Sequence, residues 1–235
     1  MTRPASISSA LDGRAVIVAG GGNDVATAVA AALAAQGAVV GRAADAADLA
    51  DRDQAFAAVD SVAAELGGLD ALVVADVPAA ARQPVPMKDM TDEHFFAVWE
   101  RTMRATLFAS QAAYPHMKRR GGGRLVAIVP SMALSGAPEY STSAAAAEGQ
   151  RLLMKSAARQ WGPDGITANT VVVATSLLLP GVCDFEFSLA ERALGSVGDP
   201  SSDVAPVVAF LCSGASHFLT GTTLFCEGGL WMSAP

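Results

Sequence analysis

The sequence predicts an α/β protein built on a doubly wound parallel sheet with helices on both faces. Strand-like and helix-like segments alternate along the whole chain, and the strand-like segments are short, continuously apolar runs bounded by Gly, Pro or charged residues. A strand that is apolar along its whole length is buried on both sides, so helices must cover both faces of the sheet. No internal repeat or linker-like break interrupts the pattern, and residues 1–235 are therefore expected to form a single domain.

Each expected element follows from its periodicity and its end signals. Helix-like runs show apolar residues at helical spacing, and Thr91 followed by Asp92 and Glu93 predicts a helix start, because a hydroxyl cap and first-turn acids favour that end. The expected strands are 14–20, 38–43, 69–76, 123–130, 166–175 and 221–229, and the expected helices are 24–37, 52–68, 91–120, 140–162 and 200–214.

Composition excludes several classes of function. A formal charge of −7 and a pI near 4.9, without any basic run, make nucleic acid an unexpected partner. No segment reaches the roughly 20 apolar residues that a membrane helix needs, so no membrane partner is expected. Cys183, Cys212 and Cys226 show no ligand spacing and no signal peptide is recognisable, which indicates reduced thiols and a cytoplasmic location. The three His residues show no metal spacing either, and no metal site is expected.

Long segments of the chain resemble the short-chain dehydrogenase/reductase (SDR) superfamily. LDGRAVIVAGG resembles its opening strand and glycine turn, GGLDALVV its fourth strand and GPDGITANTV its sixth strand, while GSVGDPSSDVAPVVAFLCSGASHFLTGTTLFCEGG resembles its C-terminal helix and strand. The resemblance implies a Rossmann-like fold. In the family, a further helix and strand follow the second strand, whereas here only a short segment joins Val40 to Asp51, which implies a sheet shortened around the second and third strands.

The resemblance places the glycine turn of the cofactor site, TGxxxGxG in the family, on residues 19–26. Gly20 matches the first glycine, Gly21 and Gly22 lie at the permissive positions, and Asp24 and Ala26 replace the second and third glycines. Asn23 or Asp24 is expected to cap the following helix at the end that normally receives the pyrophosphate. The Asp24 carboxylate, ~4 Å from a bound pyrophosphate, would be repelled by about 4 kcal/mol at an effective dielectric of 20. We therefore expect that this turn binds no pyrophosphate.

Other cofactor positions are also altered relative to the family. Asp48 matches the carboxylate that holds the adenine amino group, although a surface-loop acid is commonly just solvated. The NNAG segment falls on residues 74–77, VADV, and the PG pair falls on Val173 and Ala174. We therefore expect no cofactor, with NAD(P) as the cofactor if this interpretation is wrong.

The catalytic set of the family consists of Asn, Ser, Tyr and Lys, in which the Tyr phenol transfers the proton and the Lys holds the ribose. The resemblance places these four positions on Thr102, Pro130, Ser143 and Ala147. Proline offers no donor, a serine hydroxyl is a poor acid, and alanine cannot bind ribose. No catalytic residue is therefore predicted with these roles.

Two nearby residues, Ser131 and Tyr140, are fallback candidates for catalysis. Ser131 follows Pro130 directly, but a shift of one residue along a strand turns a side chain to the opposite face. Tyr140 would place Ala144 where the lysine belongs, and an aromatic residue that packs its ring at the start of a helix explains it more simply.

These observations lead to one main hypothesis and two alternatives. The main hypothesis is an SDR-fold protein that has lost nucleotide binding and redox activity and serves as a structural or regulatory subunit, in a dimer or tetramer with copies of itself or with an active SDR chain. The first alternative is an enzyme that performs cofactor-independent chemistry in the old substrate cleft. The second is an NAD(P)-dependent oxidoreductase with atypical motifs.

Overall fold

The computed structural model describes residues 11–21, 23–43, 47–182 and 191–232. Six parallel strands form one sheet in the order β2-β1-β3-β4-β5-β6. The strands are β1 (Ala15–Ala19), β2 (Val39–Ala43), β3 (Ala71–Val74), β4 (Gly123–Pro130), β5 (Ile166–Val173) and β6 (Thr223–Cys226). The predicted fold class is therefore confirmed, including the shortened sheet, because β2 is followed by a helix and β3 already pairs with β1.

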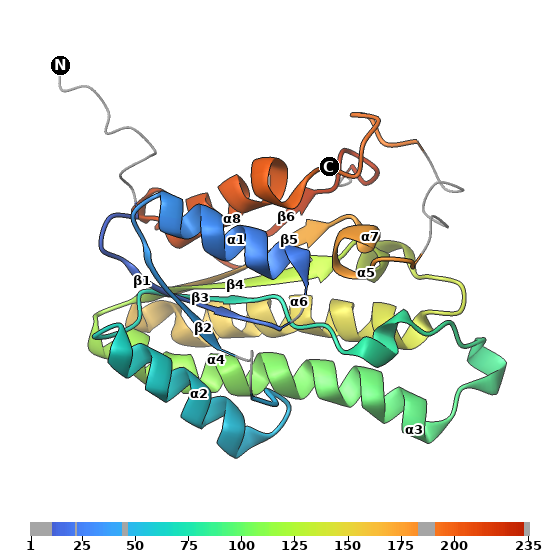
Figure 1. Ribbon diagram of the computed structural model, residues 1–235, viewed down its shortest axis with the longest axis horizontal. Helices are drawn as coiled ribbons and strands as arrows, with labels where there is room; N and C mark the ends of the chain where they lie inside the picture. The colour runs from blue at the N-terminus through green and yellow to red at the C-terminus, as the bar shows by residue number, and fades with distance from the viewer. Residues whose placement is uncertain (1–10, 22, 44–46, 183–190, 233–235) are drawn as a thin grey trace.

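Helices cover both faces of the sheet, as Figure 1 shows. One face carries α1 (Asp24–Ala35), α5 (Met132–Ser135), α7 (Thr175–Leu178) and α8 (Ala205–Cys212), and the other carries α2 (Arg52–Glu65), α4 (Arg101–Arg119) and α6 (Ser141–Trp161). Successive strand residues enter opposite cores: Val16 and Val18 pack under α1 and α8, and Ile17 packs against the α2 and α4 side. This alternation explains why β1 is apolar at every position.

Two predicted helices contain π-helical turns that the sequence did not reveal. The expected helix 91–120 begins as α3 (Asp92–Phe95), widens into the π-helical segment η4 (Phe96–Glu100) and continues as α4. The helix predicted from Pro200 likewise starts as the π-helical segment η7 (Pro200–Val204) before α8. A π turn adds one residue to a single turn of a longer helix, and a change confined to one turn does not alter the overall helical periodicity from which the helix is predicted.

Short 3₁₀ segments connect these elements, and every strand except β4 is shorter than expected. The 3₁₀ segments are η2 (Ala79–Arg82), η3 (Met87–Asp89), η5 (Gly162–Asp164) and η8 (Gly214–Ser216). β5 ends at Val173, because Thr175 already begins α7, and β6 is confined to Thr223–Cys226. Within the described residues, no helix is both long enough and apolar enough to cross a membrane.

Candidate functional site

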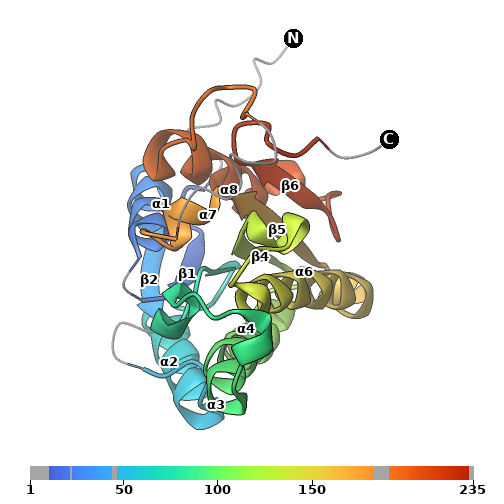
Figure 2. The same ribbon diagram turned by 90° about the vertical axis from the view of Figure 1, so that its right-hand side faces the viewer.

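The candidate site lies at the carboxyl ends of the parallel strands. β2 and β3 flank β1 on opposite sides, so the chain reverses its strand order at β1 and β3 and opens a crevice there. Figure 2 views the molecule from this end, with α3, α5 and α7 toward the viewer. The segments that follow β1, β3, β4 and β5 therefore supply residues of the candidate site.

The four residues predicted at the catalytic positions line one small cavity. Thr102 comes from α4, Pro130 from the end of β4, and Ser143 and Ala147 from α6. The cavity has a volume of about 20 Å³, which is close to the space of one water molecule. Its remaining lining residues are Asp76, Val77, Ala81, Val98, Gln150 and Leu179.

The polar groups of this cavity are largely engaged with their own surroundings. The Ser143 hydroxyl is buried and donates a hydrogen bond to the Ala81 carbonyl at 3.2 Å. The Gln150 amide nitrogen donates to Thr106 Oγ1 at 2.7 Å. Ala147 is buried and presents a methyl group. The described lining therefore contains no phenol and no ammonium group.

The two fallback residues, Ser131 and Tyr140, lie outside this cavity lining. Ser131 follows the end of β4 in a helical conformation, is fully buried, and its Oγ accepts a hydrogen bond from Thr175 N at 3.1 Å. Ser131 lies outside the cavity because β4 ends at Pro130. The sequence predicts a different reason, namely a strand residue whose side chain faces the opposite side of the sheet. Tyr140 precedes α6, and its ring packs against the core on the α1 side.

The glycine turn after β1 retains the close approach that glycine permits. Gly20 has φ +139°, and a Cβ at this position would lie 2.6 Å from the carbonyl carbon and oxygen of Ala75. Gly21 is half-buried and Ala26 is buried in α1, whereas Gly22 lies outside the described residues. The turn therefore still brings β1 against the end of β3.

Asn23, and not Asp24, caps α1. Its Oδ1 accepts from Ala26 N at 2.8 Å, and its Nδ2 donates to the Ala75 carbonyl at 2.7 Å. Asp24 is exposed in the first turn, which corrects the expectation that its carboxylate was an equal candidate for the cap. An amide cap also explains the tight packing, because Asn can donate to Ala75 while it accepts from Ala26 and Asp cannot.

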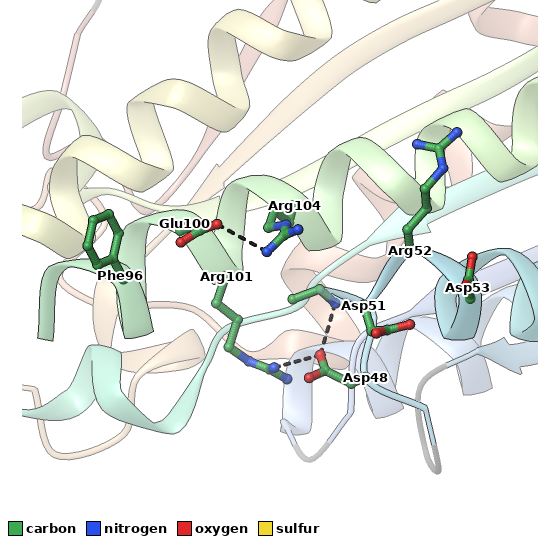
Figure 3. Close-up of a pocket in the computed structure, with 9 residues that line it drawn as sticks. Asp48, Asp51, Arg52, Asp53, Phe96, Glu100, Arg101 and Arg104 are labelled. Carbon is green, nitrogen blue, oxygen red and sulfur yellow. Dashed lines mark hydrogen bonds and ion pairs between the residues drawn. The ribbon is translucent and has the colours of Figure 1, made fainter. Parts of the chain in front are cut away.

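Asp48 is engaged by Arg101, so the expectation of a merely solvated loop acid is wrong. Arg101 Nη1 lies 2.6 Å from Asp48 Oδ1, and the same carboxylate accepts from Ala50 N at 2.9 Å. Burial raises the pKa of Asp48, but the hydrogen bonds from Arg101 and Ala50 outweigh it and the net pKa is lowered. Figure 3 shows the two side chains meeting at a surface groove of about 430 Å³.

A second arginine covers the glycine turn. Arg42, in β2, donates from Nη2 to the Gly20 carbonyl at 3.0 Å. Its guanidinium thus lies over the turn between β1 and α1. Backbone and side-chain groups of the chain itself therefore occupy hydrogen-bonding positions at both the turn and the Asp48 segment.

Asp76 is the site residue that sequence reasoning missed. It follows β3, lines the small cavity, and its Oδ2 is buried without a hydrogen-bond partner among the described residues. Burial raises the pKa of the Asp76 carboxyl; the charge of Arg101 lowers it and the charge of Asp48 raises it, leaving a net increase. The signal was an acid in the VADV segment directly after a buried strand, where a parallel sheet positions functional side chains.

The described residues contain no group of three or more His, Cys, Asp or Glu side chains able to hold a metal ion. The groove at Asp48 does bring four acids (Asp48, Asp51, Asp53 and Glu100) near three arginines (Arg52, Arg101 and Arg104). Arg101 and Arg104 form ion pairs with Asp48 and Glu100, which leaves the groove with mixed charge.

Comparison with known proteins identifies the family. The family model described as enoyl-(acyl carrier protein) reductase matches residues 8–231. A 12alpha-hydroxysteroid dehydrogenase of Clostridium sp. is 30% identical over 186 residues, which are 76% of this chain and 70% of that protein. A cis-4-hydroxycyclohexanecarboxylate dehydrogenase of Sinomonas cyclohexanicum is 31% identical over 190 residues, which are 77% and 74% of the two chains.

A solved dehydrogenase structure has the same fold. The gluconate 5-dehydrogenase of Burkholderia cenocepacia J2315, crystallised with NADP and tartrate, superposes with a TM-score of 0.80 at 25% identity and covers 96% of this chain and 98% of its own. The chain belongs to the short-chain dehydrogenase/reductase superfamily, a class of oxidoreductases.

Proposed function

We propose that this protein is a non-catalytic member of its superfamily that serves as a structural or regulatory subunit. The observation that carries the proposal is the cavity formed by Thr102, Pro130, Ser143 and Ala147, since these residues replace the Asn, Ser, Tyr and Lys of the family pattern. Proton transfer to a carbonyl needs an acid of suitable pKa within hydrogen-bonding distance. A buried serine that donates to Ala81 does not supply one.

The residues around the crevice also do not fit NAD(P). A dinucleotide needs free backbone N–H groups at the start of α1 for its pyrophosphate, and Asn23 already binds the N–H of Ala26 there. The VADV segment after β3 has neither the asparagines nor the glycine of the family's NNAG segment. The carboxylate that would hold adenine, Asp48, is paired with Arg101.

The proposed assembly surface is the outer side of α4 and α6. Leu107 on α4 and Leu152 on α6 expose 36% and 52% of their surface, although both are apolar. Between the two helices runs a narrow groove bordered by Leu107, Leu153 and Trp161. Ala145 on α6 is small and exposed, whereas Gly149 lets Met103 of α4 pack closely against α6, because a Cβ there would lie 2.6 Å from Met103 Sδ. Exposed apolar side chains along two neighbouring helices suit a second SDR chain, either identical or active.

The relatives favour a second candidate, an NAD(P)-dependent oxidoreductase with atypical motifs. The compared proteins bear the names of dehydrogenases, and the solved neighbour contains NADP. For this chain that activity would need the loop around Asn23 and Arg42 to rearrange. The cofactor-independent enzyme is a weaker candidate, because a cavity of about 20 Å³ does not admit an organic substrate.

Calorimetric titration with NADH and NADPH tests the proposal. We expect no binding of either nucleotide up to millimolar concentrations, and none to an Asp24→Gly variant, because the exposed Asp24 is not the group that closes the turn. An active SDR with known NADP binding serves as the positive control. Micromolar binding to the wild-type chain would refute the proposal and favour the oxidoreductase.

A further inference from the structure

The segment between β3 and α3 covers one side of the small cavity beside Asp76. Val77 and Ala81 of this segment line the cavity, and Figure 1 shows the chain extending beyond the carboxyl ends of the strands before it reaches α3. We propose that residues 77–90 form a lid, which is closed over the cavity while Asp76 is protonated and opens when Asp76 is ionised. The inference concerns how the chain covers its own cavity and does not depend on the proposed function.

The lid is tied to the start of α6 by three hydrogen bonds that join residues 81–90 to residues 139–143. The three are Ser143 Oγ to the Ala81 carbonyl at 3.2 Å, Val85 N to the Glu139 carbonyl at 2.7 Å, and Thr142 Oγ1 to Met90 Sδ at 3.3 Å. A thioether sulfur is a weak acceptor, so the third bond contributes little. The lid is therefore held closed mainly by the bonds to Ala81 and from Val85.

The lid has little apolar contact with the rest of the chain. Among residues 77–90, only Pro78 and Ala81 are buried. A segment with few buried contacts opens locally at a lower free energy than the core strands do. Pro78, Pro84 and Pro86 have a fixed φ, which restricts bending within the lid. Because Thr91 caps α3 directly after the lid, residues 77–90 can move as a unit between two ordered elements.

Asp76, at the β3 end of the lid, is the group that responds to pH. Its Oδ2 is buried and finds no hydrogen-bond donor among the described residues. Burial raises the pKa of Asp76; the charge of Arg101 on α4 lowers it, the charge of Asp48 before α2 raises it, and the net pKa is raised. A neutral carboxyl tolerates burial far better than a carboxylate, and opening the lid gives the carboxylate access to water.

The other charged groups of this region are engaged elsewhere or lie on the lid. Arg101 is paired with Asp48 at 2.6 Å. Arg42 of β2 donates to the Gly20 carbonyl. On the lid, Lys88 and Asp89 form an exposed ion pair. Asp76 is therefore the buried acid that the closed lid keeps from water.

The direction of the pH dependence follows from the raised pKa of Asp76 in the closed state. In the open state the carboxyl is hydrated and its pKa returns toward the ordinary value, so the closed state binds the proton more tightly. As the pH rises from the ordinary pKa through the raised one, the closed state loses stability relative to the open state, and above that range the loss is complete. The pKa of Asp48 is lowered, so Asp48 stays ionised throughout.

Amide hydrogen exchange followed by NMR tests the lid, with the protection factor of Val85 measured from about pH 4 to about pH 8. The Val85 amide reports opening because its acceptor, Glu139, lies outside the lid. Its protection factor should fall severalfold as the pH rises, relative to that of Val126 in the core strand β4. Asp76→Asn, which is neutral at every pH, should abolish this dependence. Asp89→Asn, which removes an exposed acid of the lid, should retain it.

Four outcomes would overturn the proposal. They are a pH-independent protection of Val85, the same pH response in Asp76→Asn, a response lost in Asp89→Asn, and an equal fall at Val126. If Asp76→Asn does not fold, Ser143→Ala provides a second measurement, because it removes the bond to Ala81.

Ser143→Ala should lower the protection of Val85 by about two- to tenfold at every pH, which is the effect of one hydrogen bond. Ser135→Ala is the matched control, since the Ser135 hydroxyl donates to the adjacent Gly136 carbonyl and does not contact the lid. Unchanged protection in Ser143→Ala, or an equal fall in Ser135→Ala, would refute a lid held at Ala81.

Discussion

Gly20 allows the end of β1 to lie close to the end of β3, because glycine has no side chain. Its φ of +139° lies in a region that L side chains rarely adopt, and an added Cβ would lie 2.6 Å from Ala75 backbone atoms. We expect Gly20→Ala to lower the free energy of unfolding by about 3 kcal/mol or more, because strain and overlap act together. Urea denaturation followed by circular dichroism measures this loss.

Gly162→Ala is the matched control for that prediction. Gly162 follows α6 with φ −53°, and a Cβ there would meet no atom within 4 Å. Its replacement should change stability by less than about 1 kcal/mol, and in the favourable direction. Equal losses in the two variants would show that the approach of Gly20 to Ala75 is not the cause.

Cys212 carries the second prediction at the level of single residues. Burial raises the pKa of its thiol to about 12, although the positive charges of Arg14 and Arg124 act to lower it. A thiol with a raised pKa stays protonated and unreactive below that pH. We expect iodoacetamide at pH 8 to leave Cys212 unmodified in the folded protein and to modify it in urea, as read by mass spectrometry. Modification at the same rate in both states would contradict its burial.

The start of α1 provides a prediction at the scale of an element. Asn23→Ala removes the cap to Ala26 and the hydrogen bond to Ala75, and we expect a loss of about 2 kcal/mol in unfolding free energy. Asp24→Ala is the neighbouring control and should cost only a few tenths of a kcal/mol, through the helix dipole. A larger loss of unfolding free energy for Asp24→Ala than for Asn23→Ala would show that Asp24, and not Asn23, caps α1.

Elements whose signals lie in local sequence were predicted well, whereas features set by side-chain direction were not. The apolar run at residues 123–130 and the helix from 141 follow from periodicity and end signals. The pairing of Arg101 with Asp48, 53 residues apart, depends on the rotamers of two long side chains. The sequence shows that Asp76 follows a buried strand, but its position in the cavity also depends on how the chain turns after β3.

The four family-derived positions come from three different elements, and the structure brings them around one cavity. The prediction that the chain is catalytically inactive rests on the side chains at these four positions. Sequence also could not give the cavity volume, which depends on packing among Val98, Gln150 and Leu179.

Assembly is the prediction that belongs to the whole molecule. Leu152→Glu should dissociate a complex formed through α4 and α6, because it replaces an exposed apolar side chain of that surface by a charge. Sedimentation velocity should then show a smaller species than the wild type. Val39→Glu is the control, since Val39 is equally exposed, at 51%, but lies on β2. An unchanged sedimentation coefficient for Leu152→Glu would show that the complex forms through another surface.

The shortened sheet has a consequence for colloidal behaviour. Because β2 pairs with β1 alone among the described strands, one side of β2 presents backbone donors and acceptors along the rim of the sheet. Strands of other molecules can pair with such an unpaired edge and start aggregation. Proteins commonly limit this risk with short edge strands and with charged residues in them. β2 has only five residues and contains Arg42, so the rim is short and interrupted by a cation. The β2 edge thus keeps a modest resistance to fibrillar self-association.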